Sequence, residues 1–85
     1  MNPEIIKMRN DLSLLRHKAA KLLEEGKGLI TLIRGELPPY GDDAVQRAGI
    51  DEALKLAKRL KDVKCDLVKT QAGIAELMEA LGENE

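Results

Sequence analysis

Apolar positions in the first third of the chain recur at alternating spacings of three and four residues, which is typical of a helix packing along another helix. Asn2, Pro3 and Glu4 form a favourable helix start, with a capping side chain, a proline that loses no hydrogen bond and an acidic first turn. The pattern predicts one helix over about 3–35, unbroken at Gly26–Gly28 because the stripe keeps its phase there. The stripe consists of Ile5, Met8, Leu12, Leu15, Ala19, Leu22, Gly26, Leu29 and Ile33.

The segment GELPPYGDD follows this helix and contains strong helix breakers. Pro38 and Pro39 remove two backbone donors, and the first of them disfavours the helical conformation at Leu37. Gly41 permits a positive φ angle at no steric cost. These residues predict a turn over about 36–42.

A second helix is expected over about 43–81. Asp42 or Asp43 is a candidate N-cap, and Gln46 three residues after Asp43 completes a capping-box pattern. Gly82 is a typical helix end, so residues 82–85 are expected to form a frayed acidic tail. The chain is therefore predicted to be a single all-α domain over 1–85, an antiparallel hairpin of two long helices.

Two registers of this hairpin fit the pattern. The tighter register places Gly26 opposite Ala53. A register one heptad further places Gly26 opposite Leu60, starts the second helix near Gly49 or Asp51 and lengthens the connection to 37–49. Short connections between helices are commoner, so the tighter register is favoured and the longer one stays open. In the tighter register the stripe of the second helix is Ile50, Ala53, Ala57, Leu60, Leu67 and Ile74.

More apolar residues lie beside these stripes than one partner helix can cover. Leu23, Ile30 and Leu37 repeat every seven residues on the first helix, and a second set accompanies the stripe of the second helix. Exposed Leu and Ile in such numbers favour association, so we expect a homodimeric four-helix bundle or docking on another helical protein. The candidate protein-interface residues are Leu23, Ile30, Leu37, Tyr40, Leu56, Val63, Leu77 and Leu81.

Tyr40 is the only aromatic residue and lies at the predicted turn. A tyrosine at a hairpin tip can anchor a protein interface because it is large, amphipathic and easily ordered. The run Leu37-Pro38-Pro39-Tyr40 also fits a loose pattern recognised by proline-binding domains, although a four-residue match arises often by chance. Packing of the ring back onto the prolines is an equally good interpretation.

Composition narrows the classes of function. Charged residues make up 34% of the chain but the net charge is −1, so total charge indicates neither nucleic-acid nor membrane binding. One cysteine excludes an internal disulfide, and no apolar run approaches the roughly 20 residues needed to span a bilayer. An intracellular, cytoplasmic location is expected.

The sequence offers little for catalysis. His17 stands between Arg16 and Lys18 without thiolate or carboxylate neighbours, as expected for a solvated side chain rather than a metal ligand. Cys65 lacks a second cysteine or a helix N-terminus that would activate it. No phosphate-binding, dinucleotide, zinc or calcium motif occurs. We expect no enzyme activity, cofactor, metal or small-molecule substrate.

Basic residues cluster near the middle of both helices, and in the tighter register Lys18 faces Lys61. Such a band can bind phosphates or an acidic protein, or it can be a solvated face. The lack of aromatic side chains for base stacking favours the solvated face. The candidate anion-binding residues are Arg16, Lys18, Lys21, Lys55, Lys58, Arg59, Lys61 and Lys64.

These features predict a non-enzymatic protein–protein interaction module, an adaptor, inhibitor or assembly factor that acts through its apolar helical face and hairpin tip. Its expected partner is a second copy or another helical protein. The alternatives are a nucleic-acid-binding regulator that uses the basic band, and a structural subunit of a helical assembly.

Overall fold

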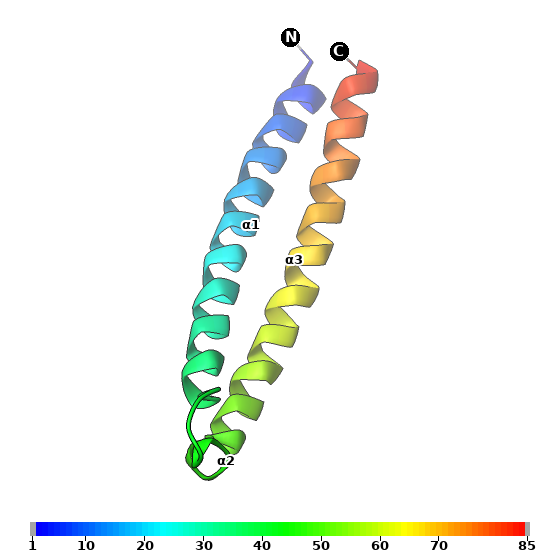
Figure 1. The fold of residues 1–85 in the computed structure, drawn as a ribbon. Helices are drawn as coiled ribbons and strands as arrows, with labels where there is room; N and C mark the ends of the chain where they lie inside the picture. Colours follow the sequence, from blue (N-terminus) through cyan, green and yellow to red (C-terminus); the bar gives the residue numbers. More distant parts are fainter. Residues whose placement is uncertain (1, 85) are drawn as a thin grey trace.

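The computed structural model describes residues 2–84, and the side chains of residues 2–82. Two long helices, α1 (Pro3–Glu36) and α3 (Ile50–Asn84), are joined through a tip that contains the single-turn helix α2 (Ala44–Arg47). The long helices lie side by side, with both chain ends at the same end of the rod (Figure 1). The rod measures 66 × 18 × 15 Å. The predicted all-helical hairpin is confirmed.

Helix α1 begins as the sequence predicts. The Asn2 side-chain oxygen accepts a hydrogen bond of 2.9 Å from the backbone N–H of Glu4, and Pro3 occupies the first helical position. The helix continues without a break through Gly26–Gly28 to Glu36, one residue beyond the predicted end. The prediction of one uninterrupted first helix is confirmed.

The tip is folded around Gly41 and Arg47. Gly41 has the only positive φ angle of the described residues, at 103°. The Arg47 guanidinium donates to the Tyr40 carbonyl at 2.6 Å and pairs with the Asp43 carboxylate at 3.0 Å. Asp43 makes no side-chain capping bond to α2. The predicted capping box with Gln46 is therefore wrong, because the Asp43 carboxylate binds Arg47 instead.

The second long helix begins later than predicted. Ala48 is extended, and the N–H of Gly49 donates to the Glu36 carbonyl at 2.7 Å, which closes the hairpin. The predicted start at residue 43 is wrong because α2 ends at Arg47 and α3 begins only at Ile50. The predicted end near 81 is also wrong, since the helix continues through Gly82 to Asn84. Residue 85 of the predicted tail lies outside the described residues.

The register is the longer of the two alternatives, and the favoured tighter register is wrong. A Cβ atom built at Gly26 would lie 3.6 Å from Val63 Cγ1 and 3.8 Å from Leu60 Cδ1. The tighter register would instead place Ala53 opposite Gly26. Doubling a loop costs only about 0.6 kcal/mol in closure entropy, whereas burying one large aliphatic side chain contributes roughly 1.5–3 kcal/mol. The longer connection is therefore a small cost beside the burial of even one such side chain.

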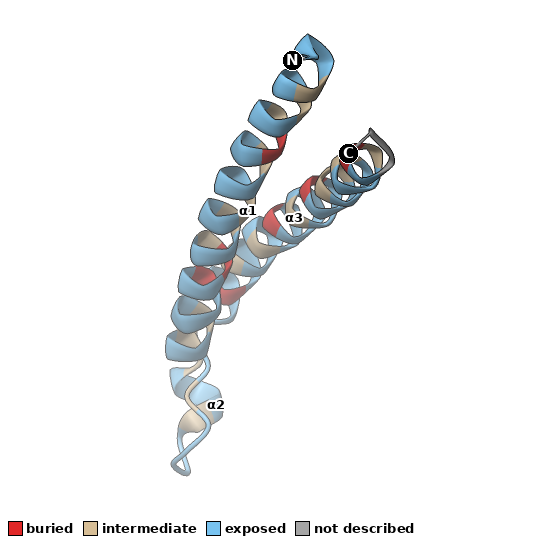
Figure 2. Cartoon of the chain, turned by 90° about the horizontal axis from the view of Figure 1, so that it is seen from above, coloured by how far each residue is buried: buried red, intermediate tan, exposed pale blue. Residues whose placement is uncertain are grey.

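The core is a continuous seam between the two long helices. Every seam residue is buried or half-buried, and the buried positions lie on the sides of α1 and α3 that face each other (Figure 2). Buried Thr70 satisfies its hydroxyl by donating to the Asp66 carbonyl at 2.7 Å. On α1 the seam is the predicted stripe of nine residues. On α3 the seam consists of Ala53, Leu56, Leu60, Val63, Leu67, Thr70, Ile74, Leu77 and Leu81.

Candidate interaction surface

The seam divides the surface of the hairpin into two flanks. In a heptad pattern, a residue directly after a seam position lies on one side of the seam, and a residue directly before it lies on the other. Two interhelical contacts agree with this division. Arg16 meets Met78 and both follow seam residues, whereas Glu25 pairs with Arg59 and both precede seam residues.

The first flank, called here the cationic flank, comprises the residues that follow seam positions. It includes no aspartate or glutamate among the described side chains. Two thirds of the exposed large apolar side chains of the described part lie on it or on its continuation at the tip. These are Ile6, Leu23, Ile30, Leu37, Ile50, Leu54, Val68 and Met78. Its basic residues are Arg9, Arg16, Lys27, Arg34, Lys61 and Lys64.

The second flank, called the mixed flank, comprises the residues that precede seam positions. It carries both signs of charge in similar numbers and only two exposed large apolar side chains, Leu14 and Leu32. The ion pair between Glu25 and Arg59 bridges the two helices on this flank. Its acidic residues are Glu4, Asp11, Glu25, Glu52, Asp62, Asp66 and Glu76, and its basic residues are Lys7, Lys18, Lys21, Lys55, Arg59 and Lys69.

A groove of about 290 Å³ lies on the cationic flank where Gly26 stands in the seam. Because Gly26 has no side chain, the floor of the groove is formed by Gly26 and the apolar seam residues around it. Lys27 on α1 and Lys64 on α3 edge the groove from opposite helices, and neither forms an ion pair with a described carboxylate. This lysine-edged groove is lined by Leu22, Leu23, Gly26, Lys27, Ile30, Leu60, Val63, Lys64 and Leu67.

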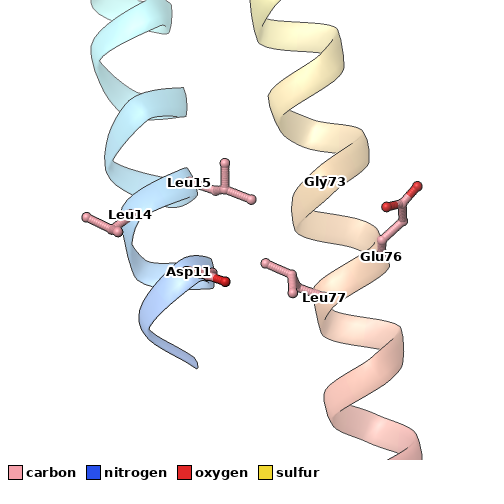
Figure 3. A pocket seen from close by; sticks show the side chains of 6 residues that line it. All are labelled: Asp11, Leu14, Leu15, Gly73, Glu76 and Leu77. Carbon is pink, nitrogen blue, oxygen red and sulfur yellow. The ribbon is translucent and has the colours of Figure 1, made fainter. Parts of the chain in front are cut away.

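A second groove, of about 420 Å³, lies on the mixed flank nearer the chain ends. Leu15 and Leu77 extend from α1 and α3 into the space between the helices, beside Gly73 (Figure 3). Its charged edges are Asp11 and Glu76, opposite in sign to the edges of the first groove. This acid-edged groove is lined by Asp11, Leu14, Leu15, Gly73, Glu76 and Leu77.

The predicted interface residues divide into two groups. Leu23, Ile30 and Leu37 are exposed on the cationic flank, as is Leu54, which was not among the predicted interface residues. Ile50 and Ala57 were predicted to lie in the stripe of the second helix, but both are exposed, so that placement is wrong.

The other predicted interface residues of α3 form part of the seam, because α3 turns its second apolar set toward α1, and Ala57 is exposed instead. A shift of one heptad alone would leave the same face of α3 in the seam. The second apolar set is Leu56, Val63, Thr70 and Leu77. Val63 and Leu81 are buried there, with 3% and 7% of their surfaces exposed, and Leu56 and Leu77 are half-buried.

Tyr40 lies at the tip with 83% of its surface exposed. Its backbone carbonyl is held by Arg47, so the residue is anchored through its main chain while its side chain is left to solvent. This exposure disfavours packing of the ring back onto the prolines. Val45 of α2, which the sequence did not single out, is exposed to 88% beside it in the same tip segment.

The predicted anion-binding residues do not form one surface. Arg16, Lys61 and Lys64 lie on the cationic flank, and Lys58 lies on the outer face of α3. The remainder, Lys18, Lys21, Lys55 and Arg59, lie on the mixed flank among acidic side chains. The predicted pairing of Lys18 with Lys61 is wrong. In the longer register the two residues are displaced by one heptad, which is about 10 Å along the helix axis.

The remaining polar chemistry is sparse. His17 and Cys65 are both exposed, and Cys65 lies in a shallow hollow of about 350 Å³ with Lys61, Lys64, Val68 and Lys69. Among the described residues, no group of three or more histidine, cysteine, aspartate or glutamate side chains is arranged to hold a metal ion. Nor does either long helix, over its described residues, contain a stretch apolar enough to cross a bilayer.

No protein-family model, curated protein or solved structure matches this chain. Its function is therefore argued from its own surface.

Proposed function

We propose that this chain is a non-enzymatic protein–protein interaction module that binds a helical partner through its cationic flank. The observation that carries the proposal is the concentration of exposed large apolar side chains on that flank, with Leu23, Ile30, Leu37, Ile50 and Leu54 gathered toward the tip. Contiguous exposed apolar surface of this kind marks interaction sites in soluble proteins.

Binding energy would come mainly from burying these side chains, at roughly 25 cal/mol per Å² before the costs of association. The basic residues between them would contribute chiefly to specificity and association rate. Tyr40 and Val45 add exposed apolar surface at the tip, where a partner could reach both.

An antiparallel helix pair with one apolar flank can complete a four-helix bundle with a second copy or with another helical protein. The charges favour another protein. A symmetric dimer through the cationic flank would place a surface that has no carboxylate among its described side chains against its own copy. Lys27 and Lys64 would then meet basic side chains. Like-charge juxtaposition opposes such an interface.

The proposal is tested with two double variants that change the same types of residue on opposite flanks. Leu23→Gln with Ile30→Gln removes apolar surface from the cationic flank, and Leu14→Gln with Leu32→Gln is the matched control on the mixed flank. Tagged chains are isolated from the native host, and co-purifying proteins are quantified by mass spectrometry. The sedimentation coefficient of each complex is also measured.

We expect a stoichiometric partner with the wild type and the control, and its loss with the cationic-flank variant. Equal capture by all three chains, or no complex with any, would refute the proposal.

A further inference from the structure

We infer that the occupant of the lysine-edged groove is an amphipathic helix that carries carboxylates along the edges of its apolar face. This inference rests on the proposed function and deepens it by naming the chemistry of the partner. Three features of the groove support the inference: its shape, the residues that line it and the positive charge of its edges.

The shape of the groove fits a helix. Leu23 and Ile30 form a wall on α1 and are seven residues apart, which is two helical turns or about 10 Å. Leu60 and Leu67 span the same interval on α3. A helix laid along the groove would thus place apolar anchors at spacings of three, four and seven residues against the floor at Gly26. This is the helix-in-groove mode of recognition.

The lining of the groove is apolar except for its edges. Of the nine lining residues, only Lys27 and Lys64 are charged, and they come from opposite helices. An occupant with an apolar centre therefore meets one ammonium group on each side. Because no described carboxylate pairs with either lysine, both are available to a partner.

The charge of the surroundings agrees with that of the edges. Arg34 and Lys61 extend the positive edge along the same flank, which carries no described acidic side chain. A helix with glutamate or aspartate beside its apolar face would match both edges, whereas a lysine-edged helix would be repelled. Electrostatic matching of this kind selects partners and accelerates association.

Two other occupants fit less well. A second copy of this chain would offer the same positive flank if it bound symmetrically. An anionic lipid surface would match the charge, but a bilayer is flat and would not fill a groove whose floor lies between two helices. An acidic-edged helix is therefore the occupant that fits both the shape and the charge of the groove.

The experiment uses the full chain and a display library of helical peptides of about 18 residues, long enough for several turns. Each peptide has apolar residues fixed at helical spacing, and its edge positions are drawn from glutamate, glutamine and lysine. Selection on the hairpin is expected to enrich glutamate over glutamine and to deplete lysine.

The affinity of a selected peptide is then compared with that of its glutamine-edged version by fluorescence anisotropy at low and high salt. We expect an advantage of about fivefold to tenfold for the glutamate version, lost at high salt.

Matched variants locate the effect. Lys27→Gln with Lys64→Gln should reduce the affinity ratio of the two peptides to about one. Lys21→Gln with Lys55→Gln makes the same change of net charge on the mixed flank and should preserve the ratio. Ile30→Gln removes a wall of the groove at an exposed position without disturbing the seam, and should weaken both peptides while helix content stays constant.

The outcomes separate this inference from the proposed function. Equal binding of glutamate- and glutamine-edged peptides, abolished by Ile30→Gln, would overturn the inference and leave the interaction module intact. Failure to select any peptide would overturn it as well. In that case self-association in sedimentation would identify a second copy as occupant, and binding to phosphatidylglycerol vesicles would identify a lipid surface. Absence of peptide, self and vesicle binding would overturn both proposals.

Discussion

The two flanks of this hairpin are built on the same seam but have opposite characters. Gly26, in the seam, opens a groove on the cationic flank, and Gly73, next to the seam, contributes to a groove on the mixed flank. A glycine thus accompanies the groove on each flank. On the cationic flank the apolar surface is left uncovered and every described charge is positive. On the mixed flank charges of both signs alternate, and Glu25 binds Arg59 across the helices. One flank carries an ion pair between the helices, and the other is the surface through which we propose that a partner binds.

The comparison shows why total charge was uninformative. The net charge of −1 is the sum of a flank whose described charges are all positive and of surfaces that are mixed or acidic. Such an asymmetry becomes visible only after each residue has been placed before or after a seam position. The predictions below test this placement, beginning with the largest expected effect.

The largest effect concerns the seam that separates the flanks. Val63→Asp would introduce a carboxylate at a position with 3% exposure, and should lower the free energy of unfolding by roughly 3–5 kcal/mol. Val68→Asp makes the same change on the cationic flank, where Val68 is 56% exposed, and should cost no more than about 0.5 kcal/mol. Urea unfolding followed by circular dichroism measures both. Similar losses for the two variants would mean that Val63 is not a seam residue.

An intermediate effect distinguishes the two grooves through their glycines. Gly26→Ala should raise the free energy of unfolding by about 1 kcal/mol, because alanine favours helix and its methyl group would make ordinary contacts with Val63 and Leu60. Gly28→Ala, with nothing within 4 Å, is the control for helix propensity alone. Gly73→Ala should gain less, because its Cβ would lie 3.2 Å from Leu15 Cδ1. Thermal unfolding ranks the three variants, and a larger gain at Gly73 than at Gly26 would contradict the packing described.

The smallest effect concerns the charges of the two flanks. Glu25→Gln should lower the free energy of unfolding by about 0.5 kcal/mol at low salt, because the ion pair with Arg59 is partly exposed. Lys27→Gln on the cationic flank should cause no loss, since Lys27 has no acidic partner among the described side chains. Urea titrations at low and high salt test both, and the effect of Glu25→Gln should shrink as salt is added. A greater loss from Lys27→Gln would show that the cationic flank contributes to hairpin stability.

Much of the fold was predictable from local signals. Asn2, Pro3 and the uninterrupted stripe specify α1 almost to the residue, and the proline pair specifies where it stops. The start of α3 was not predictable in this way. Asp43 and Gln46 have the residue types of a capping box, but the competing bond from Asp43 to Arg47 involves a side chain whose position depends on the folded tip.

The register of the hairpin decides which residues of α3 lie beside the groove, and the sequence did not settle it. Both registers satisfy the heptad spacing of α1 and present the same face of α3, because a shift of seven residues does not turn the helix. The structure has the longer register and also places Val63, instead of Ala57, in the seam. The preference for a short loop carries little weight, because closing a longer loop costs less than burying one large apolar side chain contributes. Leu23 and Ile30 could be identified as exposed from their spacing alone. The groove between them could not, because its far wall is set by the register.

The most direct test of this account is the set of nuclear Overhauser contacts of Gly26, which report its neighbours without any substitution. The structure predicts contacts from the Gly26 α-protons to the methyl groups of Val63 and Leu60, since a Cβ on Gly26 would lie 3.6 Å and 3.8 Å from those side chains. Contacts to the Ala53 methyl group instead would restore the tighter register. In that case the lysine-edged groove, and the helix proposed to occupy it, would be ruled out.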